Sequence, residues 1–278
     1  MNSSLNLRSG CLVLLAIVFV SASSAGQRGP STGGPGDIQD NSFLVEEAYN
    51  QNFGVVQHIS SFTRFWSSKD WNYTFTQEWP VPGPRHQLSV TMPLQGVEGA
   101  HGLGDVAINY RYQVRDKNGI ACAPRLSLLV PTGSSSKGLG AGGTGLQTNV
   151  AVSIALGKPA VAHENLGATW IPRAKDEAGD HARSLGFNAG QSLIWLVRPT
   201  FNALMELAWT RAQDVVGPGR TARRDTLYLS PGVRWAYNFA SGLQIVPGLA
   251  VPIGIGPSRG DTGIFLYLSF EHPFRRAK

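Results

Sequence analysis

Apolar and polar residues alternate along most of this chain in runs of about ten residues, and each run ends at a turn. The stretch 226–239 shows the pattern most clearly. From Leu227 to Phe239 its odd-numbered positions are mostly large and apolar, and its even-numbered positions are mostly polar or small. A period of two is typical of a β-strand with one apolar face. A tilted strand of about 9–11 residues is long enough to cross a bilayer.

Twelve strands of this kind are predicted after residue 52. Closing them into an antiparallel barrel pairs every backbone N–H and C=O group, which lipid requires. We therefore predict an all-β fold, an up-and-down transmembrane barrel of about twelve strands. Alternation is weakest in the first and seventh of them. The predicted strands are 53–66, 71–81, 86–95, 104–115, 120–131, 146–156, 160–171, 183–196, 200–211, 224–238, 243–256 and 261–271.

The connections between these strands alternate in length. Every second gap is a tight turn, such as Asn118-Gly119, and three of the others are long, at 132–145, 172–182 and 212–223. Tight turns at one end and long loops at the other are typical of outer-membrane barrels, in which the turns face the periplasm. The alternating apolar and aromatic residues of 261–271 resemble the C-terminal signal that the outer-membrane insertion machinery reads.

The composition agrees with a lipid-facing barrel. Charged residues make up 15% of the chain, whereas a soluble domain usually carries about 25%. The net charge is +6, and basic residues gather in predicted loops. For an exported chain this excess indicates attraction to an anionic membrane surface or to anionic solutes, rather than to nucleic acid.

The first residues predict export. Arg8 precedes a ten-residue apolar run, 11–20, and small residues follow it at 23–25. The run is too short for a spanning helix, which needs about 20 residues, and is typical of a cleaved signal peptide. We assign 1–25 to the signal peptide, 26–52 to a linker and short N-terminal segment, and 53–278 to the barrel. Residues 41–52 are predicted to form one or two helical turns that enter the lumen.

Several short motifs resemble chemical sites without their required setting. The glycine-rich stretch 138–143 and the G-x-S-x-G stretch 256–260 both join strands, whereas the functional motifs need a following helix. His163-Glu164 lacks the second histidine of a zincin. Acidic residues at 176–180 do not have the spacing of an EF-hand. No catalytic residue, metal or cofactor is predicted, and the chain is not expected to be an enzyme.

Strand parity predicts which polar side chains point into the lumen. An arginine or lysine on the lipid face costs about 2–4 kcal/mol at the bilayer midplane, so charged positions should face inward. There they could screen anionic or polar solutes, or they could form structural ion pairs across a narrow barrel. The predicted lumenal residues are Glu78, Asn109, Arg111, Gln113, Arg115, Arg125, Gln147, Asn149, Asn202, Glu206, Arg234, Asn238 and Glu271.

The stretch 38–51, IQDNSFLVEEAYNQ, followed by GVVQHI at 54–59, resembles a bacterial family described as outer-membrane transporters of the MetA pathway of phenol degradation. This resemblance implies an outer-membrane channel for aromatic or other hydrophobic compounds. Five motif residues are candidates for a constriction of the lumen: Phe43, Glu46, Glu47, Tyr49 and His58.

We therefore expect passive movement of small molecules through a barrel of the Gram-negative outer membrane. A lipase-like barrel enzyme, a structural barrel with a sealed lumen and a soluble β-sandwich are the alternatives. The expected partners are outer-membrane lipid, lipopolysaccharide, the insertion machinery and small-molecule solutes.

Overall fold

The computed structural model describes residues 37–273 of the 278-residue chain. The predicted signal peptide, 1–25, and residues 26–36 of the predicted linker lie outside the described residues.

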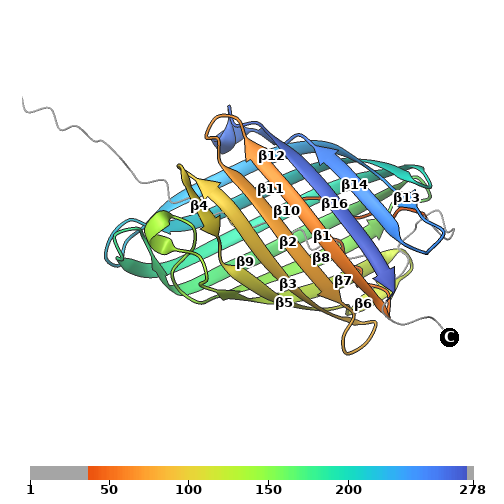
Figure 1. Cartoon of the computed structure of the whole chain (residues 1–278), viewed down its shortest axis with the longest axis horizontal. Coiled ribbons are helices and arrows are strands. Elements are labelled where there is room, and N and C mark those ends of the chain that lie inside the picture. The colour runs from red at the N-terminus through yellow and green to blue at the C-terminus, as the bar shows by residue number, and fades with distance from the viewer. Residues whose placement is uncertain (1–36, 274–278) are drawn as a thin grey trace, which may run out of the picture.

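Twelve antiparallel strands form a closed barrel (Figure 1), as the alternation predicts. Strands adjacent in sequence pair with each other, and the circle closes through β1 with β16 and through β12 with β14. All twelve predicted strands are present, the first and seventh included. Their bounds are β1 Val55–Phe65, β2 Trp71–Trp79, β3 His86–Val97, β5 Val106–Tyr112, β7 Ile120–Val130, β8 Gly145–Ala155, β9 Ala160–Lys175, β10 His181–Arg198, β11 Phe201–Val215, β12 Thr221–Trp235, β14 Gln244–Ala250 and β16 Gly263–Pro273.

Four short strands and two single 3-10 turns complete the described chain. The short strands pair with β3, β7, β14 and β12 respectively. They are β4 Ala100–Leu103, β6 Arg115–Lys117, β13 Tyr237–Asn238 and β15 Ile253–Gly254, and the 3-10 turns are η1 Ser135–Lys137 and η2 Gly256–Ser258. The start of β1 and the end of β16 lie at the same end as β6 and β13, which we call the short-turn end (Figure 1). The opposite end, with β4 and η1, is the long-loop end.

Two of the three predicted long loops are wrong. Residues 172–182 and 212–223 mostly continue the hairpins β9–β10 and β11–β12, whose turns are only 176–180 and 216–220. The extended hairpins persist because Ala174, Ala182 and Val215 turn inward and bury themselves with Ile171 and Ala141. Of the three predicted long loops, the stretch 131–144 is the one that the structure confirms, and it contains η1.

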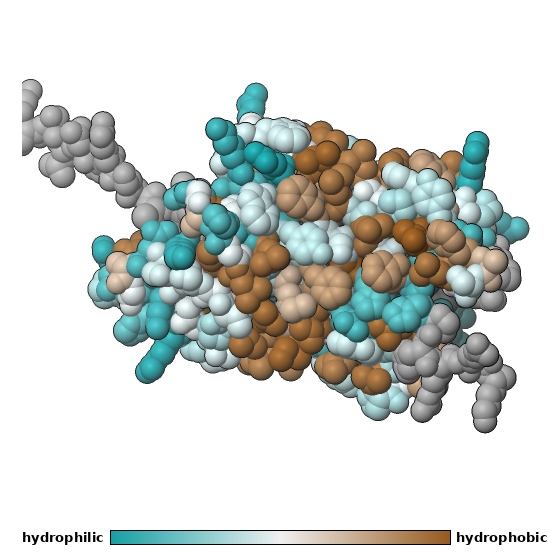
Figure 2. All heavy atoms as spheres, in the orientation of Figure 1, coloured by the Kyte–Doolittle hydropathy of each residue, from teal (hydrophilic) through white to brown (hydrophobic). Residues whose placement is uncertain are grey.

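The outer wall of the barrel carries an apolar belt, which the exposed hydrogen bond from Gln191 Nε2 to Glu164 Oε1 interrupts. Large side chains such as Leu126, Leu166 and Trp170 point outward and are exposed. Figure 2 shows the belt on one face as brown surface between hydrophilic ends. Tryptophans border the belt on both sides: Trp66, Trp71, Trp170 and Trp209 toward the long-loop end, and Trp79, Trp195 and Trp235 toward the short-turn end. This arrangement suits a bilayer with aromatic residues at both interfaces.

Polar side chains fill the interior, so the barrel is inverted relative to a soluble protein. Serine and threonine hydroxyls on neighbouring strands bond one another, as in the Ser61–Thr74 pair at 2.6 Å and the Thr76–Thr91 pair at 2.9 Å. Among residues 37–273, none of the helical segments has the length and apolar character needed to cross a membrane.

Residues 37–52, which we call the inner segment, lie inside the barrel near the short-turn end. Most of their side chains are buried, and Asn52 at the end of the segment is exposed. The predicted helical turns at 41–52 are wrong, because the segment has no regular secondary structure. The reason is that side chains of the barrel wall bond its backbone groups, which leaves them unavailable for a helix.

Candidate functional site

The inner segment is the centre of the candidate site, and its first residues are attached to the barrel near the short-turn end. The backbone N–H of Ile38 donates to the carbonyl of Pro199 at 2.7 Å. Asn202 Nδ2 donates to the Gln39 carbonyl at 2.9 Å, and Arg234 Nη1 donates to the Asn41 carbonyl at 2.6 Å. Since Val55 begins β1 at the same end, the segment enters the lumen and returns to the end at which it entered.

A single carboxylate oxygen holds the next three residues. Glu206 Oε1, from the middle of β11, accepts the backbone N–H groups of Phe43, Leu44 and Val45 at 3.0, 2.8 and 3.1 Å. Consecutive N–H groups that converge on one point form a concavity suited to an anion. Here the anion belongs to the barrel wall, and the segment wraps around it.

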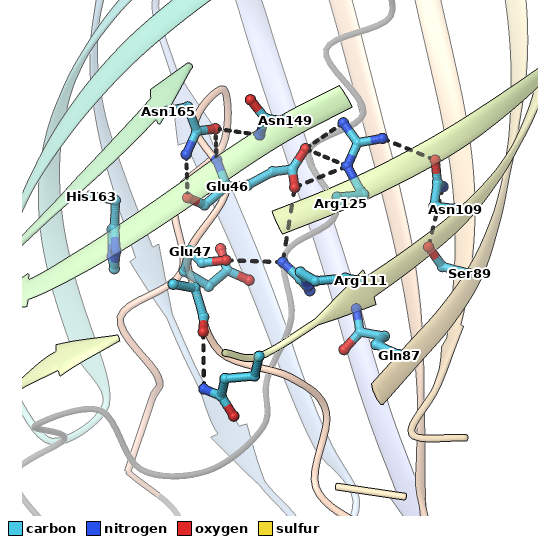
Figure 3. Close-up of polar contacts among 12 residues, drawn as sticks. Glu46, Glu47, Gln87, Ser89, Asn109, Arg111, Arg125, Asn149, His163 and Asn165 are labelled. Carbon is cyan, nitrogen blue, oxygen red and sulfur yellow. Dashed lines mark hydrogen bonds and ion pairs between the residues drawn. The ribbon is translucent and has the colours of Figure 1, made fainter. Parts of the chain in front are cut away.

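Glu46 forms a buried ion pair with Arg125 on β7. Arg125 Nη2 lies 2.7 Å from Glu46 Oε1, and Arg125 Nε also donates to this carboxylate at 2.9 Å. Arg111, opposite Arg125 on β5, lies 3.9 Å from Glu46 Oε2 and donates to the Glu47 carbonyl at 2.9 Å. Figure 3 shows Glu46 pointing from the segment toward Arg125, with Arg111 beside it.

The peptide groups of Glu46 are clamped from the other side by Asn165 on β9. Its Oδ1 accepts the Glu46 N–H at 2.7 Å, and its Nδ2 donates to the Glu46 carbonyl at 2.7 Å (Figure 3). One side-chain amide thus satisfies both backbone groups of Glu46, while Arg125 holds its side chain.

A serine and a histidine of the wall bond two separate parts of the segment. Ser153 Oγ accepts the Ala48 N–H at 2.8 Å and lies 2.7 Å from His163 Nδ1. His163 Nε2 donates to the Asp40 carbonyl at 2.7 Å, which assigns the proton to Nε2 and leaves Nδ1 to accept from Ser153. Both wall side chains are fully buried. This pair therefore connects the start of the segment, at Asp40, with its later part, at Ala48. The pair lies in the lumen, whereas the lipase-like alternative needs a serine and a histidine on the outer wall.

Phe43 occupies an aromatic slot in the barrel wall. Its ring centroid lies 5.1 Å from that of Phe265 and 5.2 Å from that of Tyr267. Two glycines make room for the ring, because a Cβ on Gly248 would come within 2.5 Å of Phe43, and one on Gly232 within 2.9 Å. Ile59, Ile194, Leu204 and Val246 complete a buried apolar cluster around the slot.

Most of the predicted lumenal residues do point inward. Ten of them are buried: Glu78, Asn109, Arg111, Gln113, Arg125, Gln147, Asn149, Asn202, Glu206 and Arg234. Glu271 lies on the inner face of β16, where it accepts a hydrogen bond from Gln57 Nε2 at 3.3 Å. The exterior placement of two others corrects the prediction. Arg115 on β6 and Asn238 on β13 are exposed, because both lie where the ladder has already passed into a turn.

Of the constriction candidates, Phe43, Glu46, Glu47 and Tyr49 are buried inside the barrel. The prediction for His58 is wrong. Its ring stacks on Phe270 and His272 on the outer face, with centroid distances of 4.9 and 5.1 Å. The parity of β1 explains this, since the neighbouring Gln57 and Ile59 are the residues that point inward.

Sequence reasoning missed the wall residues that bind the inner segment's peptide groups. Ser153, His163, Asn165 and Gln87 all point inward, and Gln87 Oε1 accepts the Gln51 N–H at 2.7 Å. Strand parity places all four on the lumenal face. No sequence signal could show that backbone N–H and carbonyl groups would be their partners.

Comparisons with known proteins support the fold. No family model matches the chain, and no curated protein matches it. Solved structures do. The COG4313 outer membrane channel from Pseudomonas putida F1 is 13% identical with a TM-score of 0.63, and the match covers 81% of this chain and 97% of that one. The NanC porin is 11% identical with a TM-score of 0.54, over 77% of this chain and 98% of that one.

The barrel has the fold of outer-membrane channels. At these low identities the likeness concerns the architecture alone, so the role of each lumenal residue rests on its geometry in this chain.

Proposed function

We propose that this protein is an outer-membrane channel for passive movement of small molecules, and that the inner segment constricts its lumen. The fold, the apolar belt and the two bands of tryptophan support a place in the outer membrane. The main support for a constriction is that residues 38–51 lie inside the barrel. A solute that crosses the lumen must pass or displace this segment.

The aromatic slot supports aromatic or other hydrophobic compounds as the solutes. It holds a phenyl ring, that of Phe43, between aromatic side chains and above two glycines. The resemblance of residues 38–59 to the outer-membrane transporters of the MetA pathway of phenol degradation points to the same class of compound. We propose membership of that family on this ground.

The lumenal arginines favour anchoring of the segment over screening of anions. Arg125 is paired with Glu46, Arg111 binds the Glu47 carbonyl and Arg234 binds the Asn41 carbonyl. Each of the three arginines thus binds the inner segment through at least one guanidinium nitrogen, although Arg111 Nε and Nη2 and Arg234 Nε have no hydrogen-bond partner among the described residues. The interpretation of structural ion pairing across a narrow barrel therefore describes these residues better than a solute filter.

Deletion of residues 38–52 tests the constriction. We expect single-channel conductance in planar bilayers to increase several-fold, since the segment would no longer occupy the lumen. The control is heat-modifiable migration on gels, which shows that the shortened chain still forms a barrel. Unchanged conductance from a folded barrel would overturn the proposal.

A structural barrel with a sealed lumen is the second candidate, because the segment is bonded to the wall along most of its length. Liposome swelling with phenol, benzoate and sugars separates the two. Faster entry of phenol than of sugars of equal concentration supports the channel. Absence of entry for every solute, in proteoliposomes that contain folded protein, supports the sealed barrel.

A further inference from the structure

A groove of about 490 Å³ lies at the short-turn end, outside the lumen. It runs between the β10–β11 turn and the junction of β12 with β13. Its lining residues are Val197, Arg198, Thr200, Phe201, Trp235, Ala236 and Tyr237. Of its lining residues, Ala236 also packs against the buried apolar cluster around Phe43, and the aromatic residues Phe201, Trp235 and Tyr237 are not part of that cluster.

The parity of the strands shows that the groove opens on the outer surface. Asn202 and Arg234 point into the lumen and are buried, so the adjacent Phe201 and Trp235 point outward. Val197 and Tyr237 are also outward, with 55% and 58% of their surface exposed. A membrane protein presents this wall to lipid, at the level where aromatic side chains border the hydrocarbon region.

The groove combines an apolar floor with a cation at its rim. Phe201 and Trp235 offer aromatic surface, and the guanidinium of the exposed Arg198 has the planar geometry that suits a phosphate. A second cation, Lys158, belongs to the neighbouring turn. That turn is held beside the groove by the hydrogen bond from the Leu196 N–H to the Pro159 carbonyl, at 2.8 Å.

The turns of the short-turn end carry an excess of positive charge, as the rim of the groove does. Among the described residues, the exposed charged side chains of its five turns are basic with one exception, Asp116. The basic ones are Arg85, Arg115, Lys117, Lys158 and Arg198. The long-loop end, by contrast, mixes both signs and pairs several of them, as in Arg223–Asp225 and Arg224–Asp214.

We propose that this groove binds one anionic glycerophospholipid from the membrane leaflet around the short-turn end. The lipid phosphate lies against Arg198 and within reach of Lys158, and the start of an acyl chain covers Phe201 and Trp235. The proposal rests on the membrane location proposed above. It makes no use of the lumen.

Native mass spectrometry of the detergent-solubilised full chain tests the site, with phosphatidylglycerol and phosphatidylcholine as the two probes. A cation near a membrane surface is worth about 1 kcal/mol toward anionic lipid, which is roughly fivefold in affinity. We expect the first phosphatidylglycerol to bind at least about fivefold more tightly than phosphatidylcholine. Arg198→Gln should remove most of that preference, and Lys158→Gln should remove part of it.

Arg183→Gln is the matched control, because Arg183 is an exposed, outward-facing arginine toward the other end of β10. It should leave the preference unchanged. Equal binding of the two lipids by the unaltered protein would overturn the proposal, and so would equal losses in Arg198→Gln and Arg183→Gln. Arg198 is exposed at the last position of β10, and heat-modifiable migration verifies that the variant keeps the barrel. The two tests are independent. Absence of a lipid preference would not change the conductance expected of the 38–52 deletion, and unchanged conductance in that deletion would not change the lipid preference.

Discussion

Phe43 and Gly248 show how one residue type in the barrel wall determines what the lumen can hold. A Cβ on Gly248 would lie 2.5 Å from Phe43 Cζ, well inside van der Waals contact. Gly248→Ala should therefore displace the ring and lower the thermal unfolding temperature in detergent, since overpacking costs about 1–3 kcal/mol. Gly83→Ala, where a Cβ meets nothing within 4 Å, is the control. In a Phe43→Ala background the same Gly248→Ala change should lower the unfolding temperature much less, and an equal loss in both backgrounds would refute the contact.

Arg125 and Glu46 make a second prediction at this scale. Arg125→Gln leaves the buried Glu46 carboxylate with only the more distant Arg111, and breaking a buried pair usually costs about 3–5 kcal/mol. We expect the inner segment to detach in part, which raises conductance and makes the open level noisier in planar bilayers. Arg223→Gln breaks an exposed pair with Asp225, where the cost is at most about 1 kcal/mol, and should leave conductance unchanged. A quiet, unaltered Arg125→Gln channel would contradict the anchoring role.

Among the elements, the loop 131–144 is held over the long-loop end by one carboxylate. Asp105 Oδ1 accepts the Gly133 N–H at 2.9 Å, and its Oδ2 accepts the Ala141 N–H at 2.7 Å. Burial raises the pKa of Asp105 above its ordinary value, and the two N–H groups act against that rise. Lys137 in this loop is already exposed, so Asp105→Ala should speed tryptic cleavage after it by freeing the loop backbone to enter the protease. Cleavage at equal rates in both proteins would show that other contacts, such as Gln95 Nε2 to the Leu139 carbonyl at 2.8 Å, hold the loop alone.

The elements also show what could be predicted from the sequence and what could not. Period-two alternation is enough to place all twelve strands, because each strand has one lipid-facing and one lumenal side. It underestimates how far β9 to β12 extend at the long-loop end. There the inward positions hold small residues such as Ala174 and Ala182, which give only a weak apolar signal. The inner segment is harder still. Its apolar and acidic residues suggest a helix, and only the wall side chains, distant in sequence, determine its extended path.

At the scale of the whole molecule, the closed sheet leads to a prediction about behaviour in detergent. The ladder closes the circle through the β1–β16 pairs and, over Gly232–Arg234, through the β12–β14 pairs, so unfolding must first break this circle. We expect the purified protein to migrate faster on sodium dodecyl sulfate gels before heating than after it, and to leave membranes only with detergent. Recovery of the mature chain in aqueous buffer would refute the barrel in favour of a soluble sandwich.

The two ends of the inner segment lie on the same side of the molecule, at Pro199 and at the start of β1. A plug tied in this way can be withdrawn toward one compartment without passing a free end through the pore. A force that acts on the inner segment from the long-loop end moves it out of the lumen toward the short-turn end. A force from the short-turn end moves it further into the lumen. The two ends of the barrel are therefore not equivalent, and we expect the conductance in planar bilayers to differ between the two polarities of applied voltage.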